Sequence, residues 1–299
     1  MDSVVDFEMD NKTPGKDITT EDLETKFPLA AKKHDNHKTV VKIDDIEIGG
    51  NELIIFAGPN TVENREMILE TAEQVKKRGA HFLRAGAYKP LTFPYRSDSY
   101  FELREKGLEY LKEAKEKFGI KVITEIMHVD KIDEVSKVTD ILQVGTRNMQ
   151  NYPLLEELGK QKKPVMLKRH YGASLRDWLG AAEYILYNGN PNVILCERGV
   201  SVTHTHRSTS RFLLDLQVVP AAMDFTHLPI ITDPSHATFW ASWVAPMCFA
   251  SVASGADGVM IEVHPDPKNA ATDPLQPIGF EEFSGVMKKM KKIHSIVKG

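Results

Sequence analysis

The chain has 299 residues, of which 41% are hydrophobic and 27% are charged, so it can bury one large core or two smaller ones. A formal net charge of -4 excludes a dedicated nucleic-acid binder, because such a protein is basic overall. Cys196 and Cys248 form no CxxC motif, so neither a disulfide framework nor a structural zinc site is predicted. The N-terminus lacks the pattern of a signal peptide and no apolar run reaches the length of a membrane span. We therefore expect a cytoplasmic protein with no membrane or nucleic-acid partner.

Two short segments precede the main part of the chain. Residues 1–38 are polar and carry only one short helix-like piece, so we expect an arm that serves assembly or partner docking. Residues 39–52 alternate apolar and polar side chains around Asp44 and Asp45, a pattern typical of a β-hairpin. Such a hairpin can plug one end of a barrel formed by residues 53–299.

From residue 53 onward, short apolar runs of strand length alternate with longer helix-like segments. Strands that are apolar on both faces, each followed by a helix, indicate a parallel sheet covered by helices. Eight such units fit a single (β/α)8 barrel, the TIM barrel of the α/β class, which takes about 250 residues. An open doubly wound sheet is the alternative, but no GxGxxG motif follows the first strand. The eight runs are LIIFA, AHFLRA, IKVIT, DILQV, PVMLK, NVILC, LPIIT and DGVMIEV.

Polar residues follow the strands of the predicted barrel, at the end where the active sites of such barrels lie. One charged residue past a strand is usually solvated, but here six cations would meet at one mouth of a protein with negative net charge. Their mutual repulsion predicts an anionic ligand, a small molecule with a phosphate and a carboxylate group. The six cations are Arg84, Lys89, Arg147, Lys168, Arg169 and Arg198.

Carboxylates and imidazoles come mainly from the last two barrel units. His236, Glu262 and Asp273 form a candidate divalent-metal site, or they act on protons and on a water molecule. His204 and His206 are spaced like a pair of metal ligands, but no third ligand supports a metal there.

Seven motifs, in the order of the chain, resemble the short, barrel-only 3-deoxy-7-phosphoheptulonate (DAHP) synthases. The related 3-deoxy-manno-octulosonate 8-phosphate synthases share much of the set. The resemblance runs from about residue 40 to the C-terminus and implies a TIM barrel that condenses phosphoenolpyruvate with an aldehyde sugar. The motifs are AGPN (57–60), LRAGAYKP (83–90), VGTRN (144–148), LKR (167–169), CERG (196–199), DPSH (233–236) and EVHP (262–265).

The resemblance also implies which residues bind phosphoenolpyruvate, and this agrees with the argument from charge. Five of them hold its phosphate and carboxylate, and one further residue of the second loop is a substrate-binding candidate. The five are Arg84, Lys89, Arg147, Lys168 and Arg198, and the sixth is Thr92.

For family members that use a metal, the resemblance implies four ligands: a cysteine in AGPC, the histidine of DPSH, the glutamate of EVHP and a later aspartate. His236, Glu262 and Asp273 match the last three, but Asn60 stands where the cysteine would be. A neutral amide is a weaker ligand than a thiolate. We therefore expect activity without a cofactor and at most weak binding of Mn, Fe, Zn or Co, with these residues orienting water and the aldehyde.

The chain departs from the heptulosonate enzymes on the side of the aldehyde. Those enzymes have an arginine after KP that holds the phosphate of erythrose 4-phosphate, and this chain has Leu91 there. Arg96 either takes its place or belongs to a solvated loop. Phe239 and Trp240 either narrow the acceptor pocket or begin a helix as ordinary core residues. Together with the loop HYGASLRDW, where the family usually has a glycine after LKR, these changes predict a different aldehyde.

The predicted reaction is an aldol-type condensation in which the enol carbon of phosphoenolpyruvate attacks the aldehyde, water adds, and phosphate leaves. It belongs to carbohydrate or aromatic amino acid biosynthesis. Lys89 is the candidate that protonates the new alkoxide, while the cation cluster steadies the developing charge. The residues that place the water or the carbonyl are Asn60, His236, Glu262 and Asp273.

Three alternatives stay open. One is a metal-independent enzyme like the octulosonate-phosphate synthases that acts on another aldose. Another is a Schiff-base aldolase, with Lys168 as the nucleophile among neighbouring cations. The third is a catalytically silent barrel that binds a phosphorylated metabolite. In each case we expect a homo-oligomer, a dimer or a tetramer.

Overall fold

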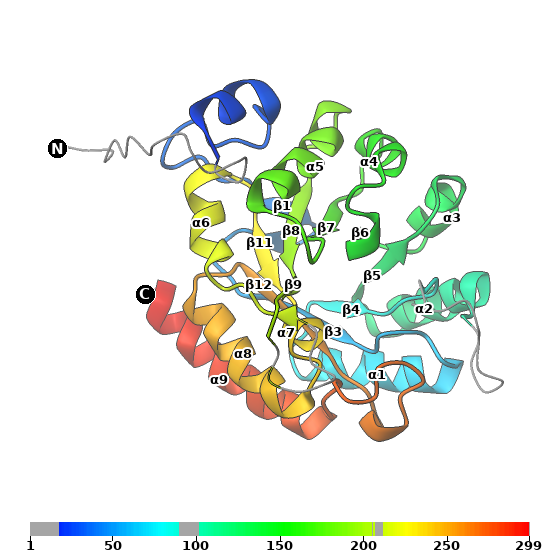
Figure 1. Ribbon diagram of the computed structural model, residues 1–299. Coiled ribbons are helices and arrows are strands. Elements are labelled where there is room, and N and C mark those ends of the chain that lie inside the picture. The colour runs from blue at the N-terminus through cyan, green and yellow to red at the C-terminus, as the bar shows by residue number, and fades with distance from the viewer. Residues whose placement is uncertain (1–17, 90–101, 205, 207–211, 299) are drawn as a thin grey trace.

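The computed structural model describes residues 18–89, 102–204, 206 and 212–298. Within them, eight parallel strands close into a barrel, and helices surround it (Figure 1). Each of these strands overlaps one of the eight apolar runs in the sequence, so the prediction of a TIM barrel is confirmed. The strands are β3 (Ile54–Gly58), β4 (Phe82–Arg84), β5 (Lys121–Ile126), β6 (Ile141–Val144), β7 (Val165–Lys168), β8 (Val193–Glu197), β11 (Ile230–Thr232) and β12 (Gly258–Glu262).

The helices begin where local signals place them. The side chain of Asn64 accepts a hydrogen bond from the backbone of Met67 and so caps the first helix, and Ser174 and Asp177 form a reciprocal capping box on the fifth. Their buried faces pack on the outside of the barrel in one large apolar core. The helices are α1 (Arg65–Lys77), α2 (Arg104–Phe118), α3 (Ile132–Ser136), α4 (Tyr152–Gly159), α5 (Leu175–Tyr187), α6 (Val218–Phe225), α7 (Pro234–Thr238), α8 (Ala241–Ala253) and α9 (Phe280–Lys298).

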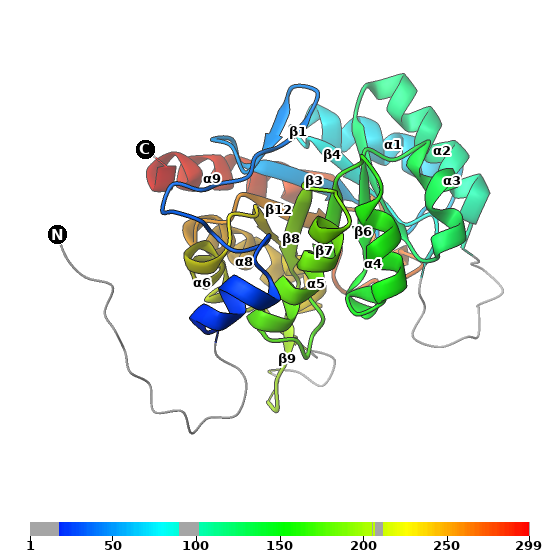
Figure 2. The same cartoon turned by 90° about the horizontal axis from the view of Figure 1, so that it is seen from above.

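A second apolar cluster fills the barrel interior at its N-terminal end. Strands β1 (Val41–Ile43) and β2 (Ile46–Ile48) form an antiparallel hairpin across this end. Its buried side chains pack against residues inside the barrel, where the rings of Phe56 and Phe82 stack with centroids 4.7 Å apart. Figure 2 shows this hairpin and the strand β9 (Val200–Ser201) at opposite ends of the barrel. The hairpin therefore gives the barrel a closed, apolar floor.

The described part of the N-terminal segment lies along the side of the barrel, next to α5 and α6 (Figure 1). It contains a short π-helix, Asp22–Lys26, whose buried Asp22 pairs with Arg176 of α5 at 2.8 Å. The buried carboxylate of Glu183 in α5 accepts hydrogen bonds from two backbone N–H groups of the segment, at Leu29 and Ala30. These contacts fix the segment to the outside of the barrel, away from its mouth. Across the described ranges, we find no helix with both the length and the apolar character needed to cross a membrane.

Candidate active site

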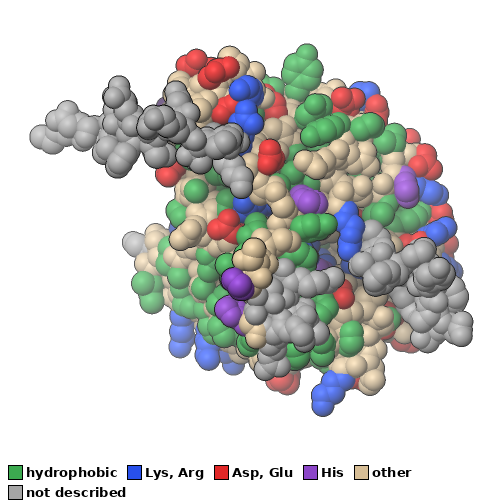
Figure 3. Space-filling model, in the orientation of Figure 1, with side chains coloured by type: hydrophobic (Ala, Val, Ile, Leu, Met, Phe, Trp, Pro, Cys, Tyr) green, Lys and Arg blue, Asp and Glu red, His purple; other side chains and the backbone are tan. Residues whose placement is uncertain are grey.

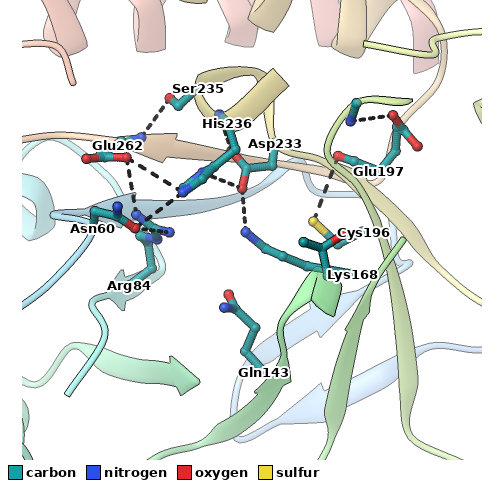
Figure 4. Close-up of polar contacts among 12 residues, drawn as sticks. Asn60, Arg84, Gln143, Lys168, Cys196, Glu197, Asp233, Ser235, His236 and Glu262 are labelled. Carbon is teal, nitrogen blue, oxygen red and sulfur yellow. Dashed lines mark hydrogen bonds and ion pairs between the residues drawn. The ribbon is translucent and has the colours of Figure 1, made fainter. Parts of the chain in front are cut away.

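The carboxyl ends of the strands bring the predicted polar residues together at the mouth, opposite the hairpin (Figure 4). Arg84, Lys168 and Glu262 are the last residues of β4, β7 and β12, and all three are at most 5% exposed. Gly58 in the AGPN motif has a φ of 146°, and a Cβ atom there would lie 2.4 Å from the carbonyl oxygen of Arg84. Only glycine lets β3 and β4 approach this closely, so this residue helps to place Arg84.

On one side of the mouth, the carboxylate of Asp233 contacts both a lysine and a histidine side chain. Its carboxylate lies 2.5 Å from Nζ of Lys168 and 2.9 Å from Nδ1 of His236, and it also caps α7 by accepting the backbone N–H of His236. Burial alone would raise the pKa of Asp233, but His236 and Lys168 hold it well below its usual range. Burial lowers the pKa of His236 well below its usual range, with Asp233 opposing the effect. An ionised aspartate thus anchors Lys168 and the imidazole.

Asn60 joins the other side of the mouth into one hydrogen-bonded group. Its Oδ1 accepts from Nζ of Lys89 at 2.6 Å and from Arg84 at 3.4 Å, and lies 3.2 Å from Nε2 of His236. Its Nδ2 donates to the carboxylate of Asp273 at 3.0 Å. An amide can do both because it carries a donor and an acceptor. Burial lowers the pKa of Lys89, which suits an amine that releases a proton during a reaction.

Glu262 completes this group from β12. Its Oε2 accepts a hydrogen bond from Nε2 of Gln276 at 2.5 Å and lies 3.7 Å from Arg84 and 3.9 Å from His236. Its backbone N–H donates to Oγ of Ser235. Burial raises the pKa of Glu262 to about 7, although Arg84 and Gln276 favour the ionised form. This carboxyl can therefore exchange a proton near neutral pH.

Two arginines at the mouth hold buried N–H groups that lack a hydrogen-bond partner in the described part of the chain. These are Nη1 of Arg84 and Nη1 of Arg198. The guanidinium of Arg198 lies over the ring of Phe212, 4.3 Å from its centroid, and burial lowers the pKa of this arginine. A buried donor without a partner costs about 1–3 kcal/mol. Such donors on cations fit an anionic ligand that accepts from them.

A small cavity of about 10 Å³ lies at the ends of β3 to β6, and Asn60, Arg84, Lys89, Glu125 and Gln143 are among the residues that line it. This is about enough room for one water molecule, which needs two to four polar partners. The cavity adjoins the Asn60 group and can therefore hold water next to it.

Not every predicted residue joins these groups. Arg147 lies in the short 3-10 helix Thr146–Asn148 after β6 and is exposed. Arg169 turns aside, because its Nη1 pairs with Glu197 at 3.1 Å and with Asp215 at 2.8 Å. The protein's own carboxylates thus neutralise part of the charge that the sequence assigned to a ligand. Thr92, Leu91 and Arg96 lie outside the described residues.

Two further predictions concern the aromatic pair Phe239 and Trp240 and the histidines of the loop after β8. Phe239 ends α7 in a left-handed conformation and Trp240 precedes α8, and both are half-buried, so neither belongs to the fully buried core. His264 pairs with Glu63 at 3.1 Å and so fixes a loop. His204 is exposed. In Figure 3, which shows the mouth face, cationic and histidine side chains lie near the centre of this face.

Sequence reasoning missed Gln276 and Asp215. Neither follows a strand directly, because Gln276 lies 14 residues after Glu262 and Asp215 lies 18 residues after Glu197. The only available signal was their place in loops between barrel strands, and this signal does not single out one polar residue among several.

The residues at the mouth do not fit a transition-metal centre of the thiolate type. Across the described ranges, no three His, Cys, Asp or Glu side chains are arranged to hold a metal ion. Asn60 stands where the resemblance implies a cysteine thiolate in metal-using members, and its Oδ1 already faces the cationic side chains of Lys89 and Arg84. Positive charge at this oxygen repels a metal cation, and a neutral amide binds it weakly.

The family model described as the DAHP synthetase I family matches residues 27–298. The phospho-2-dehydro-3-deoxyheptonate aldolase of Thermotoga maritima is 42% identical over 267 residues, which cover 89% of this chain and 77% of that protein. The 2-dehydro-3-deoxyphosphooctonate aldolase of Syntrophobacter fumaroxidans is 28% identical over 84% of this chain and 90% of its own length.

Solved structures agree with these relatives. The crystal structure of the Thermotoga maritima DAHP synthase superposes with a TM-score of 0.84 at 41% identity, over 90% of this chain and 77% of that one. A truncated form of the same enzyme gives a TM-score of 0.82 at 39% identity, over 91% of this chain and 98% of that one. Fold, strand-end residues and relatives agree, and the chain belongs to the DAHP synthetase I family.

Proposed function

We propose that this chain condenses phosphoenolpyruvate with an aldose or aldose phosphate to a 3-deoxy-2-ulosonate and releases phosphate. The observation that carries the proposal is the pair of buried arginines, Arg84 and Arg198, whose Nη1 atoms lack a hydrogen-bond partner in the described part of the chain. A phosphate with a nearby carboxylate can accept from both. The names of the relatives, two aldolases that act on phosphorylated deoxy sugars, support the same reaction class.

In the proposed mechanism, Arg84, Lys168 and Arg198, with Arg147 from the rim, bind the anionic groups of phosphoenolpyruvate. The enol carbon attacks the aldehyde carbonyl, a new C–C bond forms, and the carbonyl oxygen becomes an alkoxide. Lys89 protonates this alkoxide, because its buried amine has a lowered pKa. Water then adds to the carbon that bears the phosphate ester, and cleavage of its bond to the ester oxygen releases phosphate.

The Asn60 group places the aldehyde carbonyl and the water. Asn60, His236, Glu262 and Asp273 offer a donor amide, an imidazole and two carboxylates within one hydrogen-bonded network. A carboxyl with a pKa of about 7, that of Glu262, can take a proton from the water and return it to the leaving phosphate. The other proton of the added water is released when the ester C–O bond breaks, and it returns Lys89 to its protonated form. Protons and charge then balance without an external acid.

We also propose that the condensation needs no metal, because Asn60 and the cations around it disfavour one. We expect enzyme treated with EDTA and shown to be metal-free by elemental analysis to keep its turnover. If turnover is abolished and one divalent cation restores it, then Asn60 serves as a metal ligand and the proposal is wrong.

The aldehyde differs from that of the heptulosonate enzymes, because Leu91 replaces the arginine that the resemblance assigns to its phosphate. The test is a panel in which the protein and phosphoenolpyruvate are incubated with erythrose 4-phosphate, arabinose 5-phosphate and their unphosphorylated counterparts. We expect phosphate release with one of these other than erythrose 4-phosphate. If phosphate is released with erythrose 4-phosphate alone, the chain has the activity of the heptulosonate enzymes and the prediction of a different aldehyde is wrong. If phosphoenolpyruvate binds but no aldose leads to phosphate release, a catalytically silent barrel is favoured.

A Schiff-base mechanism is less well supported. The nitrogen of Lys168 is bound in the ion pair with Asp233 at 2.5 Å, so it is not free to attack a carbonyl. We expect borohydride to trap no covalent adduct between the enzyme and its substrates. A substrate-sized mass increase on a peptide that contains Lys168 would decide for the Schiff base.

The location and the assembly of the protein are part of the same proposal. Two buried, unpaired cysteines are compatible with the cytoplasm. Exposed tyrosines on α4 and α5, Tyr152, Tyr184 and Tyr187, support a dimer or a tetramer, because such apolar surface favours association. Light scattering on the purified protein distinguishes these states from a monomer.

A further inference from the structure

The loop between β12 and α9 is held against the mouth at several points. Glu63 accepts one hydrogen bond from the backbone of Ala271 at 2.9 Å, and its Oε1 lies 3.1 Å from Nε2 of His264. The backbone of Ile278 pairs with that of Glu262 and His264. Between these ties the chain turns at Asp273, whose φ of 50° is rare for residues other than glycine. The turn is therefore held by hydrogen bonds on both sides of Asp273.

This turn carries two side chains into the Asn60 group. Asp273 accepts from Nδ2 of Asn60 at 3.0 Å, and Gln276 donates to Oε2 of Glu262 at 2.5 Å. Gln276 is only 1% exposed, and its Oε1 is buried without a partner in the described part of the chain. A buried amide with one unsatisfied end destabilises the fold. The buried position of Gln276 is explained if Glu262 needs the hydrogen bond that the Nε2 group of Gln276 donates.

Glu262 needs this hydrogen bond because its carboxylate lies beside Arg84. Its Oε2 lies 3.7 Å from Nη1 of Arg84, beyond the 2.7–2.9 Å of a charge-assisted hydrogen bond. Without another donor, a buried carboxylate gains most by closing this gap and forming a full ion pair. Arg84 would then offer fewer N–H groups to an anionic substrate. The amide of Gln276 gives Glu262 an alternative partner at the same oxygen.

We infer that Gln276 is a positioning residue that holds Glu262 away from Arg84 and so keeps this arginine free for phosphoenolpyruvate. The inference rests on the proposed function, because it takes phosphoenolpyruvate as the anion at Arg84. Gln276 acts through Glu262 and makes no contact with the substrate itself.

The experiment measures the affinity of phosphoenolpyruvate by calorimetry in a double-mutant cycle. Gln276→Met keeps the length of the side chain and removes the donor, and it weakens binding on the order of tenfold. In a Glu262→Gln background the carboxylate that competes for Arg84 is gone, so Gln276→Met then leaves the affinity unchanged. The matched control is Asn269→Ala, which removes an exposed hydrogen bond to Asp266 in the same loop and keeps wild-type affinity.

Each result decides the matter. Equal weakening by Gln276→Met in both backgrounds, or no weakening in either, overturns the inference, because the effect then does not pass through Glu262. A wild-type protein that binds no phosphoenolpyruvate refutes the proposed function instead. Circular dichroism checks the fold of each variant. If Gln276→Met does not fold, Gln276→Asn replaces it, since its amide is one methylene too short to reach Glu262 and the same tenfold loss is expected.

Discussion

The two ends of the barrel are built from the same eight strands and differ in almost every other respect. At the N-terminal end, the hairpin residues Val41, Ile43 and Ile48 meet the stacked rings of Phe56 and Phe82, and all five are at most 9% exposed. At the C-terminal end, equally buried positions carry charges, and two arginines keep N–H groups without a hydrogen-bond partner in the described part of the chain. The floor therefore stabilises the fold, while the mouth tolerates unfavourable groups that a ligand can satisfy.

The largest effect is expected at the floor. Phe56→Ala removes a fully buried ring and leaves a cavity beside Phe82, so it lowers the free energy of unfolding by about 3–5 kcal/mol. Urea denaturation measures this loss. The kinetic constants of the folded fraction stay unchanged, because the ring belongs to the apolar cluster of the floor and carries no polar group. A large change in the KM for phosphoenolpyruvate would show that the two ends are not separate.

At the mouth, the opposite pattern is expected for Arg198→Met. The variant lowers kcat/KM for phosphoenolpyruvate by roughly 10²–10³-fold, the loss typical when one donor to a developing charge is removed. Its melting temperature stays equal or rises, since a buried cation with an unpaired N–H has been replaced by an apolar chain. Arg176→Met is the matched control, because this arginine lies on the outside of the barrel and turnover does not depend on it. A variant that melts earlier and keeps its turnover would reverse the roles assigned to Arg198.

Glu262 should make stability depend on pH. Its pKa is raised from 4.5 to about 7 by burial, so below pH 4.5 the group is protonated in the folded and the unfolded chain alike. As the pH rises from 4.5 to 7, the unfolded chain loses this proton while the folded chain still holds it, so the stability contributed by the protonated carboxyl is lost across this range. Glu262→Gln keeps a neutral side chain, so its stability relative to wild type should increase between pH 4.5 and 7 in urea denaturation. A difference that does not change with pH would place the pKa of Glu262 near its usual value.

The smallest effect is expected for the hairpin. Ile48→Val removes one buried methyl group from the floor and costs about 0.5–1.5 kcal/mol of stability, with no change in turnover. Thermal unfolding and a steady-state assay on the same sample check both parts. Loss of activity without loss of stability would indicate that the floor influences the mouth.

The sequence predicted the floor and the strands better than the site. Apolar runs of strand length mark β3 to β8, β11 and β12, because burial on both faces leaves a continuous pattern. The alternation around Asp44 and Asp45 likewise marked the hairpin that closes the floor. These features depend on local composition, so a single sequence shows them.

The contacts within the site could be predicted only in part. The rule that residues at the carboxyl ends of barrel strands lie at one mouth predicted the positions of Asn60, Lys89, His236 and Glu262. The structure brings these four side chains together. The same rule could not show that Arg169 turns to Glu197, because side-chain direction depends on partners far apart in the sequence. Gln276 was missed for the same reason, since its contact with Glu262 depends on the shape of a turn.

Titration of phosphoenolpyruvate into the metal-free wild-type protein by calorimetry tests most directly whether the mouth binds this compound. We expect saturable binding at one site per chain that weakens with added salt and is lost in Arg198→Met, while Phe56→Ala retains it. Absence of binding to the folded wild-type protein, or undiminished binding to Arg198→Met, would contradict the proposal that the mouth binds phosphoenolpyruvate.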